Sequence, residues 1–473
     1  MRDKAVSSDR RRSISLMRFR MRFTESAEAV CSRLSLGSWA FAAFTFFILL
    51  FFLKPNAPET LEYFGLNSPV SLVTWQVLLV ALSCGLMAFY FRVVGLDLFG
   101  GLVLALFVII ALATISNRGD MTSWVFDSFP CMALALFVGA SWKTGRVEQL
   151  LKGAMLASTF YLIANLVLLL LGGQLFSADP VTDLFYGYRN ITFRVAIPAF
   201  SCSLVLDSMH RDGPSVRSWL IFAVSLAEML IAYSATSVCG MAVMGVLVFS
   251  SRFGRLRRFF NGLTGLCFYA AAFLGIVVFR VQDYAAPVIE NVLGRSVTLT
   301  GRTFIWDEVF QLLDGIHLVK GYGQSYIWNA LVVNNEAFMH AHNEFLHVFM
   351  LGGVVGAAVF VTILVLVAWH LFRYRASFGA ACLSATLFAY LVIGLAETTL
   401  FPSSFFLLAV MYYYCRYRCC IKESRSTVPF VCYKTERRRH RGRHARTCFA
   451  SRPRIMISTA RCLSTAPGLK CSV

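Results

Sequence analysis

The sequence predicts an all-α polytopic membrane protein with about twelve transmembrane helices and one large outer loop that carries short helices. Composition is the first indication: hydrophobic residues make up 58% of the 473 residues, whereas charged residues make up only 15%. The mean hydropathy of +0.65 is the second. The third is a series of apolar runs, many of them close to the roughly 20 residues that cross a bilayer. Together these observations exclude an ordinary soluble domain.

The predicted spans fall into two groups, helices 1–9 within residues 36–280 and helices 10–12 within residues 345–415. Each span is a mostly apolar run bounded by polar residues or turn formers. The individual spans are expected near 36–53, 70–91, 96–115, 128–142, 151–172, 193–209, 217–233, 236–251, 262–280, 347–372, 378–396 and 400–415.

Basic residues decide the expected orientation, because Lys and Arg are enriched in cytoplasmic loops. With the N-terminus inside, the inner loops contain Arg92; Lys143, Arg146 and Lys152; His210, Arg211 and Arg217; Arg252, Arg255, Arg257 and Arg258; Arg373 and Arg375. The alternate loops are poor in basic residues, and an even number of spans returns the C-terminus to the same side. We therefore expect both termini in the cytoplasm and the loop 281–344 in the periplasm, across a bacterial inner (plasma) membrane.

Both termini are strongly basic and account for most of the net charge of +19. Residues 1–35 hold nine basic and four acidic residues, and residues 416–473 hold fifteen and two. The first segment lacks an apolar core followed by small residues, so we expect a cytoplasmic segment before an uncleaved anchor. The second has no helical period and is expected to be a disordered cytoplasmic tail. Charge beside a membrane favours anionic lipid heads and gives no reason to expect a nucleic-acid partner.

The outer loop 281–344 is expected to contain an amphipathic helix after Thr300-Gly301. Its apolar positions recur at helical spacing, with polar residues on the opposite side. The apolar face consists of Ile305, Val309, Leu312, Leu313 and Ile316, and the polar face of Asp307, Glu308, Gln311 and Asp314. Thr300 is the expected N-cap and Asp314-Gly315 the expected end. Arg302 then lies at the helix N-terminus, where free N–H groups and a guanidinium suit a phosphate.

The same loop collects polar side chains that are able to do chemistry. Arg302 could clamp a diphosphate or anchor the loop on lipid phosphates. His340 and His342 lie just before the tenth span; an imidazole could deprotonate a sugar hydroxyl, but a histidine at a membrane border is also a common interfacial residue. Asn343 could orient a histidine, bind a sugar hydroxyl or cap the next helix. The loop holds no cysteine and no acidic cluster beside the histidines, so no metal site is expected.

Two further groups are weaker candidates. Gly321-Tyr-Gly323 allows a tight turn, and Tyr322 and Trp328 could stack on sugar rings or belong to an aromatic belt at the membrane interface. In the earlier outer loop, Arg189 and Arg194 lie on the side of the membrane where basic residues are uncommon. They could be snorkelling anchors or a second arm for an anionic donor.

These elements occur in the order found in the O-antigen ligase / O-antigen polymerase superfamily, which the chain resembles. The shared run consists of Gly301-Arg302, Trp306, Gly321-x-Gly323, His340-x-His342-Asn343, Leu346 and Gly352-Gly353. The pattern of spans extends a weaker likeness over residues 36–415. The sequence Leu299-Thr-Gly-Arg-Thr303 also resembles the exopolysaccharide-polymerase branch.

The resemblance implies transfer of a glycan from an undecaprenyl-diphosphate carrier to an acceptor hydroxyl on the outer face. It implies an inverting-type glycosyltransferase that needs no metal and no cofactor, in lipopolysaccharide or exopolysaccharide biosynthesis. By position, Arg302 matches the arginine that holds the diphosphate and His342 matches the base. The acceptor is lipid A-core for a ligase, which we place first, or a second carrier-linked repeat for a polymerase.

The chain departs from the family at one position. Many members carry a basic residue in a motif at the end of an earlier span, where Ser234-Ala235-Thr236-Ser237 has alanine. Either Arg189 or Arg194 takes its place, or the diphosphate is held differently. A transporter or flippase of lipid-linked glycans is the competing class. Transporters usually place charged residues near the bilayer midplane, whereas the polar cluster here lies in an outer loop.

Overall fold

The computed structural model describes residues 37–53, 69–171, 183–184, 187–286, 301–324, 331–333, 336–338 and 340–426. The chain divides into two units, Met1–Ser424 and Arg425–Val473. Every described residue belongs to the first unit, apart from the last two residues of the final helix. The described residues are mostly helical and form fifteen α-helices, which confirms the predicted α-helical fold class.

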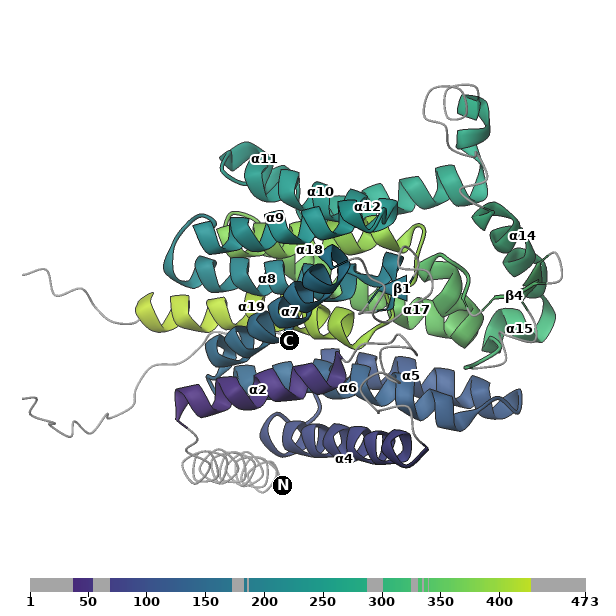
Figure 1. Ribbon diagram of the computed structural model, residues 1–473, viewed down its shortest axis with the longest axis horizontal. Coiled ribbons are helices and arrows are strands. Elements are labelled where there is room, and N and C mark those ends of the chain that lie inside the picture. Colours follow the sequence, from purple (N-terminus) through teal and green to yellow (C-terminus); the bar gives the residue numbers. More distant parts are fainter. Residues whose placement is uncertain are drawn as a thin grey trace, which may run out of the picture. The chain divides into compact units, whose positions relative to one another are not determined.

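Every apolar run predicted as a span coincides with a helix (Figure 1). The first nine are α2 (Ser38–Phe52), α4 (Pro69–Val93), α5 (Leu98–Ser116), α6 (Met121–Lys143), α7 (Val147–Leu170), α8 (Phe193–His210), α9 (Val216–Ile231), α10 (Ala235–Ser250) and α12 (Gly262–Ala272), which continues as the π-helical turn η2 (Phe273–Val278). The last three are α17 (Glu344–Arg373), α18 (Phe378–Gly394) and α19 (Pro402–Ser426).

The predicted number of about twelve spans is not confirmed. Among the described residues, five helices are long and apolar enough to cross a membrane: Val73–Val93, Leu98–Ser116, Met121–Lys143, Val147–Leu170 and Glu344–Arg373. One reason is that some helices are buried by protein and need not be apolar on every side. Helix α8 is the clearest case, because Ser201, Ser203 and Asp207 are all buried within it. Polar side chains of this kind bond across helices inside a bundle.

The core of the first unit lies around α8, α18 and α19. Ser201 of α8 and Thr386 of α18 share a hydrogen bond of 2.8 Å. Phe99 of α5 stacks on Tyr412 of α19, with ring centroids 4.9 Å apart. The surrounding helices α4, α5 and α7 expose large apolar side chains on their outer sides. Such faces suit contact with lipid, where helices satisfy their own backbone hydrogen bonds.

The outer loops contain several short elements, of which α14 and α15 lie beside α17 (Figure 1). They comprise η1 (Arg189–Ile191), η3 (Val281–Ala285), α14 (Arg302–Leu312), α15 (Gly315–Lys320) and the antiparallel pairs β1 (Asp183–Leu184) with β2 (Gly187–Tyr188) and β3 (Val332–Val333) with β4 (Glu336–Ala337). The short helix α11 (Gly254–Phe259) connects α10 and α12.

Helix α14 is the amphipathic helix expected in the loop. Its N-cap is Gly301, in the left-handed conformation with φ 83°, rather than Thr300, which lies outside the described residues. Ile305 and Val309 are buried as expected. The apolar face ends earlier than expected, because the chain breaks after Leu312 and places Ile316 in α15, where it is 67% exposed.

Helix α17 is broken at Gly353, where φ is 60° and ψ is −163°. The turn Gly321-Tyr-Gly323 fits against this break. The N–H of Tyr322 donates to the carbonyl of Met350 at 2.6 Å, and the N–H of Gly323 donates to the carbonyl of Leu351 at 3.0 Å. A Cβ on Gly353 would lie 2.1 Å from the carbonyl oxygen of Val319. The motifs Gly321-x-Gly323 and Gly352-Gly353 therefore pack against each other, and their backbones approach so closely that only glycine fits.

Candidate active site

The carboxylate of Glu397 joins three segments that are far apart in the sequence. Its Oε1 accepts hydrogen bonds from Nη2 of Arg302 at 2.5 Å and from Nδ2 of Asn190 at 3.0 Å. Its Oε2 lies 3.4 Å from Nδ1 of His342. Glu397 lies between α18 and α19 and is only 6% exposed. The structure thus brings the predicted Arg302 and His342 to one buried carboxylate.

Electrostatics keep this carboxylate ionised. Burial alone would raise the pKa of Glu397, but the neighbouring His342 and the positive charge of Arg302 outweigh burial and hold the pKa below its usual value. A buried carboxylate that meets a guanidinium and an imidazole fixes the positions of both groups. The Nε of Arg302 is buried and has no hydrogen-bond partner among the described residues, so the ion pair with Glu397 does not use all of the donors of the guanidinium.

Three histidines lie close together beside Glu397. The rings of His340 and His342 have centroids 4.1 Å apart, and the ring of His347 lies 6.4 Å from that of His340. Burial lowers the pKa of His340 to about 4, and the positive charges around it act in the same direction. His340 is therefore neutral at neutral pH, where it can accept or donate one hydrogen bond through each ring nitrogen.

The same groups meet a geometric requirement for a metal ion. His340, His342 and Glu397 offer ligand atoms that all lie within 4.8 Å of one another. Two histidines and a carboxylate are a common ligand set for catalytic zinc. The guanidinium of Arg302, however, is bonded to the same carboxylate, and its positive charge opposes a second cation there.

The motif residues around the site hold its backbone in place. Arg302 is the first residue of α14, directly after Gly301. Trp306, one turn later, is fully buried, and its Nε1 donates to the carbonyl of Ala341 at 3.1 Å. This bond joins α14 to the histidine segment, in which His342 has a positive φ of 45°. The helix that begins with the Gly-Arg motif is therefore in direct contact with the His-x-His motif.

Asn343 serves as the N-cap of α17. Its Oδ1 accepts from the N–H of Leu346 at 3.1 Å, and its Nδ2 donates to the carbonyl of Leu395 at 3.1 Å. Asn343 is fully buried. Of the three roles considered for it, the structure places it in the capping role. Its second bond also fixes the segment that leads to Glu397.

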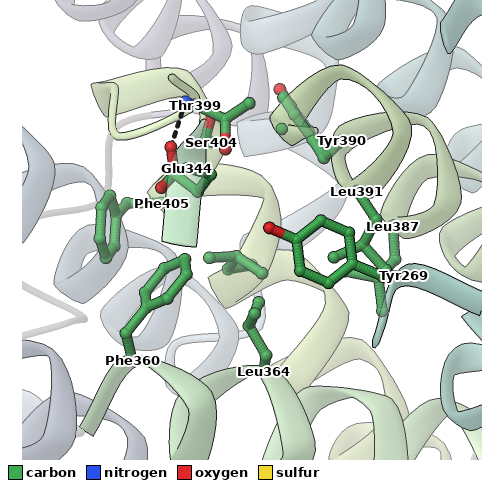
Figure 2. Close-up of a pocket in the computed structure, with 12 residues that line it drawn as sticks. Tyr269, Glu344, Phe360, Leu364, Leu387, Tyr390, Leu391, Thr399, Ser404 and Phe405 are labelled. Atoms are coloured by element: carbon green, nitrogen blue, oxygen red, sulfur yellow. Dashed lines mark hydrogen bonds between the residues drawn. The ribbon is translucent and has the colours of Figure 1, made fainter. Parts of the chain in front are cut away.

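Glu344 provides a second anchor for the same segment, because its Oε2 accepts a hydrogen bond from the N–H of Thr399 (Figure 2). Beside this bond is a cavity of about 30 Å³, into which the hydroxyl of Tyr269 points. A cavity of this size holds one or two water molecules at most. It is too small for a sugar and belongs to the interior that supports the site.

The weaker candidate residues for glycan and donor binding lie in different surroundings. Tyr322 is buried; its hydroxyl donates to the carbonyl of Leu312 at 2.9 Å, and its ring stacks on His317. Its contacts in this structure are thus packing contacts. Trp328 lies outside the described residues. Arg194 is the second residue of α8, and its Cζ lies 3.2 Å from the ring centroid of Phe401.

The alanine-containing motif contacts Asn190, which is also a partner of Glu397. Ser234 donates to Oδ1 of Asn190 at 3.3 Å, and Ser237 donates to the Asn190 carbonyl at 3.1 Å. Ala235 is the first residue of α10. Arg189 precedes Asn190 in η1, and its side chain lies outside the described part of the chain.

Sequence reasoning missed Glu397 and the role of Asn190. Glu397 occurs in the run Leu395-Ala-Glu-Thr-Thr399, as a single carboxylate between two apolar spans. Ionisable residues within membrane spans are rare and are often functional, and Glu397 directly follows the predicted span 378–396. That rule offered a signal for Glu397, whereas nothing local in the sequence connects Asn190 to it.

Comparisons with known proteins agree with the resemblance. Residues 220–361 match a family described as O-Antigen ligase. The chain is also similar to the exopolysaccharide production protein ExoQ of Rhizobium meliloti (strain 1021), at 29% identity over 150 residues. The similar region covers 29% of this chain and 34% of that relative, so the chain spans about a third of the length of the curated relative that it matches.

These matches confirm the predicted likeness to the O-antigen ligase and polymerase superfamily. The family match includes Ser234–Ser237, Arg302, His340 and His342 but ends before Glu397. Together with the apolar helices, it identifies the chain as a membrane protein related to polysaccharide-producing proteins.

Proposed function

We propose that this chain is a membrane glycosyltransferase that moves a glycan from an undecaprenyl-diphosphate carrier to an acceptor hydroxyl on the periplasmic face of a bacterial inner membrane. The observation that carries the proposal is the position of Arg302 and His342 on one buried carboxylate, Glu397. An anion-binding group and a candidate base lie side by side there. Glycosyl transfer from a diphosphate needs both groups.

The guanidinium of Arg302 binds the donor diphosphate. It is held by Glu397 through Nη2, and its buried Nε has no hydrogen-bond partner among the described residues. During transfer, the bond between the anomeric carbon and the diphosphate oxygen breaks, and negative charge grows on the leaving diphosphate. A preorganised guanidinium stabilises that charge more strongly in the transition state than in the ground state. Arg189 and Arg194 are proposed as further contacts to the same anion.

The imidazole of His342 accepts the acceptor's proton. With Nδ1 facing Glu397, Nε2 faces away from the carboxylate and takes the proton as the acceptor oxygen attacks the anomeric carbon. Glu397 then stabilises the imidazolium, as an oriented carboxylate does for other catalytic histidines. Attack opposite the leaving diphosphate inverts the anomeric centre. His340 and Asn343 border this position, and Trp328 remains a proposed glycan contact, whereas Tyr322 acts through the packing of the turn that it belongs to.

The proposed reaction uses no metal and no cofactor, because the donor is already activated by its diphosphate. His340, His342 and Glu397 form the one candidate metal cluster among the described residues. Treatment of the purified protein with EDTA, followed by activity measurement without added metal, tests this part. The proposal predicts unchanged transfer. A loss that Zn²⁺ restores would replace the base mechanism with a metal-assisted one.

Two acceptors are compatible with this site. The family match favours a ligase, in which lipid A-core accepts the glycan. Similarity to an exopolysaccharide production protein favours a polymerase, in which a second carrier-linked repeat is the acceptor. A competing class, the lipid-linked-glycan flippase, predicts transport without a new glycosidic bond.

Deletion of the gene distinguishes these functions. A ligase mutant retains long carrier-linked polymer and lacks it on lipopolysaccharide, whereas a polymerase mutant accumulates single repeats. We expect the ligase pattern. Single repeats attached to lipopolysaccharide would reject the ligase, and movement of labelled carrier-linked glycan by the purified protein with no product bond would reject transfer altogether.

A further inference from the structure

An apolar groove lies between α2, α4 and α6, apart from the carboxylate site. Its volume is about 280 Å³, and the side chains around it include Phe44, Leu86, Phe89 and Phe137. A buried cavity of about 150 Å³ is already large enough to bind benzene. This groove is larger and is open on one side, so it can hold part of an extended hydrocarbon chain.

Aromatic contacts join α2 to α4 near one end of the groove and α2 to α6 near the other. Phe51 of α2 stacks on Trp75 of α4, with ring centroids 3.9 Å apart. Toward the opposite end, Gly85 faces the space, and a Cβ added there would meet nothing within 4 Å. Phe137 of α6 forms the floor, with its ring centroid 6.3 Å from that of Phe44. Figure 1 shows α2, α4 and α6 as neighbours.

The end of the groove near Phe41 is positively charged. Arg146 lines it together with Thr144, and the guanidinium lies 5.0 Å from the ring centroid of Phe41. Lys143 and Arg92, in the last turns of α6 and α4, are exposed near the same ends of these helices. The acidic residue closest in sequence, Glu148, is bonded to Lys152 at 2.8 Å. This end is the one that the distribution of basic residues assigns to the cytoplasm.

We propose that the groove binds an anionic phospholipid of the inner leaflet, with one acyl chain between α2 and α4 and its phosphate at Arg146. The acyl chain covers apolar side chains that face no other helix among the described residues. A phosphate matches the guanidinium fork, and the nearby basic residues favour a lipid with net negative charge over a zwitterionic one. This site is independent of the proposed glycan transfer.

Photochemical labelling in nanodiscs tests the site. The full-length protein is placed in phosphatidylcholine nanodiscs that contain either phosphatidylglycerol or phosphatidylcholine with a diazirine in the acyl chain. After irradiation, labelled peptides are mapped by mass spectrometry. We expect phosphatidylglycerol to label peptides that contain Gly85 and Phe44. Arg146→Gln should reduce that label about fivefold, the effect of one basic residue at an anionic surface, and Arg146→Lys should retain most of it.

Matched glycine variants distinguish loss of lipid from the groove from damage to the fold. Gly85→Leu fills the groove and should abolish labelling, whereas Gly101→Leu on α5, where a Cβ has only ordinary contacts, should leave labelling intact. Ala81→Leu, which also lines the groove, replaces Gly85→Leu if that variant does not purify as a single species. Equal labelling by the two lipids, no effect of Arg146→Gln, or cross-linking of the groove to another segment of this chain would each reject the proposal.

Discussion

Arg302 and Glu397 form an ion pair, with Nη2 2.5 Å from Oε1, although 95 positions separate them in the sequence. Their side chains are 16% and 9% exposed. Removal of one partner from a buried pair leaves the other charge uncompensated, which costs more than the intact pair contributes. The pair therefore fixes the guanidinium before any donor arrives, and it couples the orientation of Arg302 to that of His342.

Glu397→Gln should lower the rate of glycan transfer by about tenfold or more, because neutral glutamine cannot stabilise a protonated His342. Since the carboxylate acts through the histidine, the pH dependence of the rate should also shift. The measurement is the transfer rate against pH with purified protein. Glu308→Gln makes the same chemical change in α14, away from the site. It is the matched control and should behave as wild type. A normal rate and pH profile for Glu397→Gln would remove Glu397 from the mechanism.

Arg302→Lys should reduce transfer by about 100-fold, although it keeps the charge, because an ammonium cannot bond to Glu397 and to a phosphate in the same planar arrangement. Arg252→Lys, at an exposed position after α10, is the control and should have no effect.

The same assay identifies the second contact to the diphosphate. Arg189→Ala and Arg194→Ala should each raise the donor concentration needed for half-maximal rate if that arginine compensates for Ala235. Normal donor dependence in both variants would show that neither arginine contacts the donor.

His340 should make stability depend on pH. Burial lowers its pKa in the folded protein to about 4, from a usual value of 6.5. The unfolded chain thus binds a proton at higher pH than the folded one. The stabilising effect is complete above about pH 6.5 and is lost as the pH falls toward about 4, by a few kcal/mol. Burial raises the pKa of Glu397, but His342 and Arg302 outweigh burial and lower it, so protonation of Glu397 destabilises the folded protein in the same direction.

Thermal unfolding of the purified protein across this range measures the effect. As the pH falls from 6.5 to 4, the midpoint of the wild type should fall relative to that of His340→Asn. Identical slopes for the two proteins would mean that His340 is protonated as easily in the folded protein as in water.

Gly353→Ala should severely destabilise the fold. An added Cβ meets the carbonyl of Val319 at 2.1 Å, and the left-handed φ of 60° disfavours alanine. Gly356→Ala, one turn later in the same helix, has no contact closer than 3.7 Å and should be neutral or slightly stabilising. The comparison needs only thermal unfolding and yield after purification. If both variants unfold like the wild type, the break in α17 is not needed for the fold.

The helices could be predicted from the sequence because each depends on a local run of apolar residues. The number of spans could not, since it depends on which helices are surrounded by protein. Helix α8 shows why: its buried Ser201, Ser203 and Asp207 are satisfied by neighbouring helices rather than excluded from the membrane. Hydropathy along one chain does not contain that information.

The candidate site was predictable only in part. Arg302 and His342 belong to motifs close together in one loop, whereas Asn190 and Glu397 meet although 207 positions separate them. No periodicity connects such residues. The predicted N-cap at Thr300 and the apolar role of Ile316 also differ from the structure, because Gly301 adopts a left-handed conformation and α14 ends at Leu312. Both differences are decided by local backbone geometry that a hydrophobic pattern does not specify.

The most direct test of the proposed transfer is a single-turnover assay with His342→Ala in proteoliposomes. The donor is an undecaprenyl-diphosphate-linked glycan, the acceptors are lipid A-core and a second carrier-linked repeat in separate reactions, and the readout is release of undecaprenyl diphosphate together with the new glycosidic bond. We expect His342→Ala to transfer glycan 10²–10⁴-fold more slowly than wild type with unchanged donor binding, because it lacks the general base. His340→Ala should lose less activity. Product formation by His342→Ala at nearly the wild-type rate would contradict the proposed mechanism.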